Sequence, residues 1–289
     1  MIRTFPRPLV AAALTFAFCA GAAAQSKLQL MTFTASPEGF SVNSTLVYGD
    51  KDAILIDAQF TQGDAQRLVK QIAASKKNLT IVYVTHAHPD HYFGADVIKR
   101  AFPEAKIVAL PATIKGIRAT AEAKVKQWKP IYGGNLTANP IIPEPLQGTT
   151  LTLEGETLRI VGGVQGDDSL NSYVWIPSLK ALITGDVAFH GIYPWTADTT
   201  PAERKRWIKT LDQISARNPT IVVAGHKRLE LKDDPSSLRS TREYLVFFDE
   251  ARAASKNAGE LGAKVRAKYP DLGLDVILKI GSEAAFGKK

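Results

Sequence analysis

Three of the five histidines of this chain fall within six residues, in the run H-x-H-x-D-H at positions 86–91. The run directly follows an apolar stretch at 79–84, which predicts a strand. In extended backbone, residues two apart point the same way, and a proline then turns the chain so that the last two groups face a second position nearby. Imidazole nitrogens and carboxylate oxygens suit zinc, and also iron or manganese. The four candidate ligands are His86, His88, Asp90 and His91.

Two further candidate ligands stand at the ends of other apolar segments. Asp186 follows the segment 181–184, and His226 follows the segment 220–224 and a glycine. Each is weak alone, because Gly-Asp after a strand is often only a turn and a single histidine is often a core residue. Their shared position at strand ends predicts that both meet the histidine run around a metal.

The pattern of apolar and turn residues predicts an α/β fold. Helix starts are marked by groups such as Thr200-Pro201-Ala202-Glu203, a capping box with proline at the first helical position. Residues 129–145 hold four prolines and two glycines and predict a long loop within the domain. Strands are expected at 27–34, 43–48, 53–57, 79–84, 106–110, 149–153, 157–161, 173–176, 181–184 and 220–224. Helices are expected at 63–75, 91–102, 111–128 and 200–216, and from 235 onward.

The N-terminus predicts export. Residues 1–8 carry positive charge, residues 9–20 are an apolar core too short to span a bilayer comfortably, and Ala22 to Ala24 offer small residues for cleavage. We expect a signal peptide at 1–24 and a periplasmic or secreted protein. The single cysteine, Cys19, leaves with this segment, so the mature chain has neither a disulfide nor a catalytic thiolate.

The charge balance points to no macromolecular partner. The chain has 36 basic and 28 acidic residues, a net charge of +8, with no Lys/Arg cluster interleaved with aromatics of the kind that nucleic acid needs. No later run reaches the roughly 18 apolar residues of a membrane helix. We expect a small-molecule substrate, no nucleic acid and no integral membrane segment, and the oligomeric state stays open.

The motifs at 85–91, 185–186 and 225–226 resemble those of the metallo-β-lactamase-fold hydrolases, over roughly residues 28–226. The resemblance implies a four-layer αββα sandwich of two mixed sheets with outer helices, here with a helical C-terminal extension. It implies a domain at 25–230 and the extension at 231–289. It also implies two metals per chain, with zinc as the first candidate: His86 and His88 on the first, Asp90, His91 and His226 on the second, and Asp186 bridging them. Asp57 resembles a family aspartate that supports the site from behind its ligands.

One position departs from the family pattern. The family usually has a third histidine on the first metal, in a Gly-His-Thr/Ser segment, and the matching stretch here is Gly166-Asp167-Asp168-Ser169. Counting back from the next strand places Asp167 at the histidine position, with Asp168 as the near alternative. A carboxylate there hardens the site and favours manganese or iron over zinc. Loss of the first metal is the other outcome that this change allows.

The loop after Asp186 is aromatic and is expected to line a pocket through His190, Tyr193 and Trp195. The expected activity is hydrolysis of an ester, lactone, thioester or β-lactam by metal-activated water, with Asp90 orienting the water or passing a proton. Two alternatives stay open: an iron-dependent oxidoreductase of the same fold, and a non-catalytic periplasmic protein that binds metal or ligand.

Overall fold

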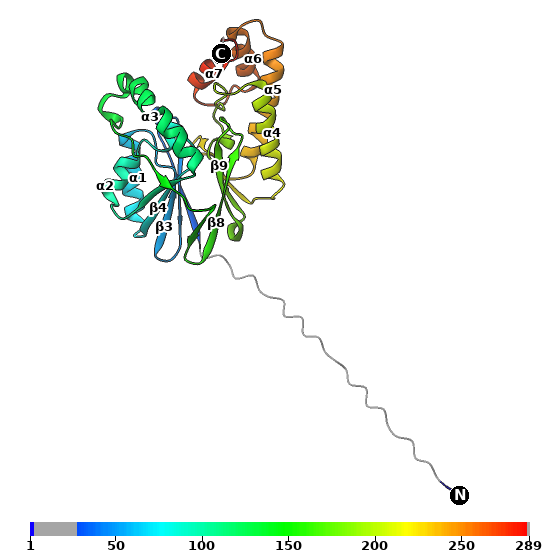
Figure 1. Cartoon of the computed structure of the whole chain (residues 1–289). Helices are drawn as coiled ribbons and strands as arrows, with labels where there is room; N and C mark the ends of the chain where they lie inside the picture. The colour runs from blue at the N-terminus through cyan, green and yellow to red at the C-terminus, as the bar shows by residue number, and fades with distance from the viewer. Residues whose placement is uncertain (3–27, 288–289) are drawn as a thin grey trace.

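The predicted strands form two sheets that face each other in the computed structural model, which describes residues 1–2 and 28–287 (Figure 1). The predicted cleavage site near Ala24 and almost all of the predicted signal peptide lie outside the described residues. The first sheet has the order β1-β2-β3-β4-β5-β6, antiparallel through β3 and parallel from β3 onward. Its strands are β1 (Gln29–Thr34), β2 (Asn43–Tyr48), β3 (Asp52–Ile56), β4 (Asn78–Val84), β5 (Lys106–Ala109) and β6 (Glu144–Pro145).

The second sheet has the order β12-β10-β9-β8-β7, with one parallel pair, β12 and β10, at its edge. A short parallel pair, β11 and β13, lies beyond it next to the candidate site. The strands are β7 (Thr150–Leu153), β8 (Glu156–Val164), β9 (Asn171–Ile176), β10 (Ala181–Ile183), β11 (Phe189–His190), β12 (Ile221–Val223) and β13 (His226–Lys227).

Helices cover the outer face of each sheet, so the chain is a four-layer α/β sandwich, as expected from the sequence (Figure 1). The first sheet carries α1 (Gln62–Ala74), α2 (Ala95–Ala101) and α3 (Pro111–Tyr132). The second carries α4 (Pro201–Ser215) and α5 (Ser236–Ala253), followed by α6 (Ala258–Lys268) and α7 (Asp275–Ala284). The capping box predicted at Thr200 and Glu203 is present at the start of α4.

Both faces of the central strands are buried, which explains why these strands are continuous apolar runs in the sequence. In β3, Leu55 packs under the helices of the first sheet, whereas its neighbours Ile54 and Ile56 pack between the two sheets. In β10, Leu182 faces α4 and α5 while Ile183 faces the first sheet. Both faces of these strands are buried, so their ends are held in fixed positions at the rim where the candidate ligands lie.

The C-terminal helices share the core of the second sheet. Leu245 and Phe248 of α5, Leu261 of α6 and Leu278 of α7 are buried in one apolar cluster with Trp207 of α4. Fully burying a side chain of this size stabilises a fold by roughly 1.5–3 kcal/mol. This packing fixes α7 beside the candidate site, whereas the domain boundary near residue 230 stays a prediction.

Two helix ends differ by four residues from the sequence prediction. The helix expected from residue 91 begins at Ala95, because Pro89–His91 forms a separate 3₁₀ turn that carries two candidate ligands. The helix expected to end at 128 continues through Pro130 to Tyr132, because Trp128 and Tyr132 pack onto the ring of Phe60. Within the part of the chain that the structure describes, no helix is long and apolar enough to cross a bilayer.

Candidate metal centre

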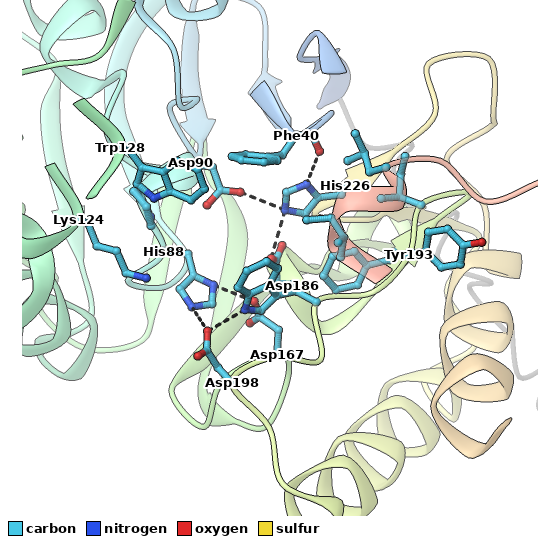
Figure 2. A pocket seen from close by; sticks show the side chains of 16 residues that line it. Phe40, His88, Asp90, Lys124, Trp128, Asp167, Asp186, Tyr193, Asp198 and His226 are labelled. Atoms are coloured by element: carbon cyan, nitrogen blue, oxygen red, sulfur yellow. Dashed lines mark hydrogen bonds and ion pairs between the residues drawn. The ribbon is translucent and has the colours of Figure 1, made fainter. Parts of the chain in front are cut away.

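Four loops bring the candidate ligands to one rim of the sandwich. They follow β4, β8, β10 and β12, and they carry residues 85–91, Asp167, Asp186 and His226. The ends of β4, β10 and β12 meet here because β10 and β12 are parallel and β4 lies in the facing sheet. Figure 2 shows five of these side chains pointing toward one another in a pocket: His88, Asp90, Asp167, Asp186 and His226.

The first donor group consists of His86, His88, Asp167 and Asp186, whose potential ligand atoms all lie within 4.8 Å of one another. His88 Nδ1 lies 2.8 Å from Asp167 Oδ2, and His86 Nε2 lies 3.9 Å from Asp167 Oδ1. His86 Nε2 is also 3.7 Å from Asp186 Oδ2. Ligands about 2 Å from one ion lie at such separations from each other.

The second donor group consists of Asp90, His91 and His226. His226 Nε2 lies 3.3 Å from Asp90 Oδ2, and His91 Nε2 lies 3.7 Å from the same oxygen. Asp186 faces this group as well, with Oδ1 3.1 Å from His91 Nε2 and Oδ2 3.2 Å from His226 Nε2. Asp186 therefore stands between the two groups, where a carboxylate can bridge two ions.

Hydrogen bonds at the Nδ1 atoms fix the tautomers of two histidines in the second donor group. His91 Nδ1 lies 2.7 Å from the carboxylate of Asp57, and His226 Nδ1 lies 2.7 Å from the backbone carbonyl of Phe40. Both oxygens accept, so both Nδ1 atoms carry a hydrogen, and in the neutral imidazole Nε2 keeps the lone pair that a metal can use. This arrangement, an oxygen behind a ligating imidazole, is the common support of metal-binding histidines.

Asp57 organises this support from the end of β3. Its carboxylate accepts the backbone N–H of Thr85 at 2.8 Å and the Thr85 hydroxyl at 2.9 Å, as well as His91 Nδ1. Because the Thr85 hydroxyl donates to Asp57, it is free to accept from His86 Nδ1, 3.0 Å away. One buried carboxylate thus orients ligands of both groups, as the sequence resemblance implies.

Several polar atoms at the centre are buried without a hydrogen bond. Among the described residues, His86 Nε2, His91 Nε2 and Asp186 Oδ1 have no hydrogen-bond partner. Leaving one buried polar atom unsatisfied costs about 1–3 kcal/mol. A divalent cation in each donor group would satisfy all three, so these residues fit bound divalent metal.

The electrostatics of the cluster also favour bound cations. Burial raises the pKa of Asp167 to about 7, and it lowers the pKa of the His86 imidazole well below its ordinary value. Burial also opposes protonation of His226, but the carboxylates of Asp186 and Asp90 outweigh it and raise the pKa of His226 to about 10. The buried carboxylates therefore demand positive charge, which imidazolium or metal ions supply.

Two glycines make the close approach of the loops possible. A Cβ on Gly225 would lie 2.1 Å from Asp186 Oδ1 and 2.6 Å from the Gly185 carbonyl oxygen. Gly185 itself has a φ of +49°, which side-chain-bearing residues rarely adopt. Gly225 is therefore required by packing and Gly185 by its backbone conformation, and the sequence pattern alone reveals neither reason.

Asp167 and Asp168, the two aspartates where the family usually has a histidine, have different surroundings in the structure. Asp167 is fully buried and faces His86 and His88. Asp168 instead accepts the backbone N–H of Leu170 at 2.7 Å and the side-chain amide of Asn171 at 3.1 Å, closing its own loop. The geometry thus favours Asp167 over Asp168 as the donor.

A pocket opens above the donor groups (Figure 2), and Tyr193 and Trp195 line it, as expected. His190 is not among its lining residues, contrary to the expectation. Neighbours on a strand point to opposite sides, so in β11 Phe189 faces the pocket while His190 Nε2 lies 3.2 Å from the Ser236 hydroxyl of α5.

Sequence reasoning missed part of the lining. Asp198 Oδ2 lies 3.6 Å from His88 Nε2 and accepts a 2.7 Å hydrogen bond from Trp195 Nε1. No local motif marks these positions, because they come from a loop and from helices that only tertiary packing brings near. The missed lining residues include Phe40, Lys124, Trp128, Asp198, Leu274 and Ile277.

Comparisons with known proteins identify the family of this chain. The family model described as the metallo-beta-lactamase superfamily matches residues 37–226. The chain is 33% identical over 207 residues to "Uncharacterized protein YobT" of Bacillus subtilis (strain 168), covering 66% of this chain and 84% of that protein.

Solved structures show the same fold at lower identity. The metallo-beta-lactamase family protein TTHA1429 from Thermus thermophilus superposes with a TM-score of 0.63 at 18% identity, covering 90% of this chain and 91% of that one. The DIM-1 metallo-beta-lactamase superposes with a TM-score of 0.54 at 20% identity, covering 78% of this chain and 94% of its own. The superfamily includes metal-dependent hydrolases. Because the family model covers residues 37–226 and the fold agrees, this chain belongs to the metallo-β-lactamase superfamily.

Proposed function

We propose that the protein is a metal-dependent hydrolase that opens an ester, lactone, thioester or β-lactam. The observation that supports this most directly is the pair of adjacent donor groups on the floor of a pocket, with buried Nε2 atoms that lack hydrogen-bond partners. An oxygen- and imidazole-lined floor beneath an apolar wall suits a substrate whose reactive carbonyl must be polarised while its body is bound by packing.

The position of each residue indicates which metal ion it would bind. His86, His88 and Asp167 would hold one ion, Asp90, His91 and His226 a second, and Asp186 would contact both. Ions bound in this way polarise a carbonyl and lower the pKa of water toward about 7.

Asp90 is the proposed proton carrier. Its side chain is 14% exposed, in contrast to the fully buried His91, and it lines the pocket. A carboxylate at the pocket floor can orient the attacking water and then pass a proton to the leaving group. Asp57 and the Phe40 carbonyl keep the neighbouring imidazoles in the orientation that this role requires.

We propose two metals per chain, with zinc as the first candidate and manganese or iron as competitors. The two donor groups support the number, and Asp167 supports the competitors, because replacing an imidazole by a carboxylate favours harder ions. Elemental analysis of protein purified without added metal tests both points. The variant Asp167→His should shift the preference toward zinc.

The decisive experiment combines metal content with turnover. Wild type, His88→Ala and Asp186→Ala are assayed on a panel of a 4-nitrophenyl ester, a γ-lactone, a thioester and a β-lactam, each with zinc, manganese and iron(II). We expect both variants to lose bound metal and hydrolysis together. His190→Gln is the matched control, because this histidine lies outside the cluster and glutamine can keep the bond to Ser236. Full activity in metal-free His88→Ala protein contradicts the proposal.

An iron-dependent oxidoreductase is the second candidate, favoured by one observation. Two imidazoles with a carboxylate, as at His86, His88 and Asp167, are a donor set that iron(II) enzymes use for oxygen chemistry. Iron as the resident metal, together with oxygen consumption and no hydrolysis, would select it. Tight metal binding without any turnover would select the third candidate, a periplasmic binding protein.

We further propose that the protein is exported, which rests on the charged and apolar segments of residues 1–20 and the alanines at 22–24. The test is fractionation of cells expressing the full chain, with N-terminal sequencing of the recovered protein. Cleavage after Ala24 and recovery outside the cytoplasm are expected, and an intact N-terminus in the cytoplasm contradicts export.

A further inference from the structure

The pocket has two unlike walls on either side of the metal centre. The wall formed by α3 carries Lys124 and Trp128, whereas the opposite wall includes Leu274 and Ile277. Ile192 and Tyr193, from the loop after β11, complete the apolar wall. A substrate whose reactive bond lies at the floor would therefore extend in two directions into different chemical surroundings.

Lys124 is the only basic side chain, histidines apart, among the described residues that line the pocket. It is half-buried, and Figure 2 shows its amino end pointing toward His88. Within the described residues it makes no hydrogen bond or ion pair, although four carboxylates line the same pocket. The buried Lys227, by contrast, is paired with Asp233. The ammonium of Lys124 is therefore left for a group that is not part of the protein.

The charge of the pocket with its metal ions bound determines whether the group that Lys124 binds is an anion or a cation. This step rests on the function proposed above. Two divalent ions would engage the carboxylates of the donor groups, and none of the four pocket carboxylates pairs with the ammonium of Lys124. An unpaired ammonium in a pocket with apolar walls attracts an anion and repels a cation. The four carboxylates are those of Asp90, Asp167, Asp186 and Asp198.

We propose that Lys124 binds an anionic group of the substrate and that the substrate is an amphiphilic acyl compound. Its anionic group, such as a carboxylate, lies on the α3 side of the reactive bond, and its apolar group lies against Leu274 and Ile277 of the opposite wall. Lys124 is in this respect a specificity-determining residue, because it selects among the esters, lactones and thioesters that the metal centre can open.

The test uses two esters that differ in one charge, 4-nitrophenyl hexanoate and 4-nitrophenyl hydrogen adipate. In both, water adds its oxygen to the acyl carbon as the bond to 4-nitrophenolate breaks, and the protons pass to the buffer. We expect the metal-loaded wild type to favour the adipate ester. Lys124→Gln should lower kcat/KM for that ester about tenfold, mainly through KM, which is the loss expected for one charged hydrogen bond.

The control variant is Lys126→Gln, which removes the same charge from an exposed position on the same helix. It should change neither ester by more than about twofold, the usual range for a surface substitution. Lys124→Glu should reverse the preference toward the neutral hexanoate ester. Equal effects of Lys124→Gln on both esters, or an equal effect of the two glutamine variants on the adipate ester, overturn the proposal.

A binding assay separates failure of this inference from failure of the hydrolase proposal. Trp128 and Trp195 line the pocket, so tryptophan fluorescence can report ligand binding. If wild type hydrolyses neither ester, titration with 4-phenylbutyrate still tests Lys124. Its Kd should rise about tenfold in Lys124→Gln and not in Lys126→Gln, while the neutral 4-phenylbutanamide is unaffected. An unchanged Kd for 4-phenylbutyrate in Lys124→Gln refutes the role of Lys124 whatever the enzyme hydrolyses.

Discussion

Replacing Asp57 by asparagine should weaken metal binding without removing any proposed metal ligand. Asp57 has a φ of +63°, a left-handed conformation that asparagine adopts more readily than most residues, so the exchange keeps both shape and backbone. The amide keeps one oxygen acceptor, but it loses the charge and presents an N–H₂ group where the carboxylate accepts from Thr85 and His91.

The expected magnitude follows from that lost support. Removing the hydrogen-bond partner behind a ligating histidine costs about 10–100-fold in metal affinity, or about 1.4–2.7 kcal/mol. The effect should be largest at the second donor group, because the bond from His91 Nδ1 to Asp57 is only 2.7 Å long and completely buried. The assay is a competition titration of metal-free protein with a coloured chelator, giving the Kd of each site for zinc and manganese.

Asp64→Asn is the matched control. Asp64 is also a buried aspartate, and it accepts bonds from Ser36 and Thr61 at the start of α1, away from the donor groups. Both variants should lose stability to urea, since each weakens hydrogen bonds to a buried carboxylate. Only Asp57→Asn should weaken metal binding. The same Kd in Asp57→Asn as in Asp64→Asn would refute the reasoning that Asp57 orients the ligands.

Two further predictions concern the contact of Gly225 with Asp186 and the hydrogen bonds between two hairpin turns, β2–β3 of the first sheet and β7–β8 of the second. Gly225→Ala should displace Asp186, lowering the metal content and destabilising the fold by about 1–3 kcal/mol in urea unfolding, and unchanged metal content would contradict it. The exposed carboxylate of Glu154 accepts the backbone N–H groups of residues 50–52, which lowers its pKa from 4.5 to about 2. Folding therefore favours the ionised form: this stabilisation is complete above pH 4.5 and is lost as the pH falls toward 2. Glu154→Gln should be less stable than wild type at pH 7, with a gap in the urea midpoint that narrows between pH 4.5 and 2, and a pH-independent gap would disprove the linkage.

Much of the fold could be predicted from the sequence, because its signals are local. The run at 86–91 follows a strand whose apolar residues are contiguous, and the capping residues before α4 mark a helix start within four positions. Hydrophobic periodicity gave the two groups of strands and the helices between them, and the four-layer sandwich was confirmed. The start of α2 was misplaced because a 3₁₀ turn and the first turn of an α-helix have similar sequence patterns.

Part of the metal-donor arrangement could also be predicted from residues that are close in the sequence. Spacing along one loop placed His86 and His88 together, since neighbours two apart in extended backbone share a side. The choice between Asp167 and Asp168 was not local, because both stand on one loop and both accept from the amide of Asn171. Only the folded loop turns Asp167 toward His88 and Asp168 toward the backbone N–H of Leu170. His190 was misassigned for a related reason: the direction of a side chain on a two-residue strand depends on its partner strand.

The sequence by itself determined the donor chemistry, the strand ends that carry it and the superfamily to which the chain belongs. The tertiary structure alone decided which groups line the pocket: Asp198 beside His88, Lys124 from α3, and Leu274 and Ile277 at the start of α7. The physical reason is range. Ligand spacing and strand alternation are properties of a few consecutive residues, whereas a pocket wall depends on how distant helices pack, and that packing is determined by the whole buried core.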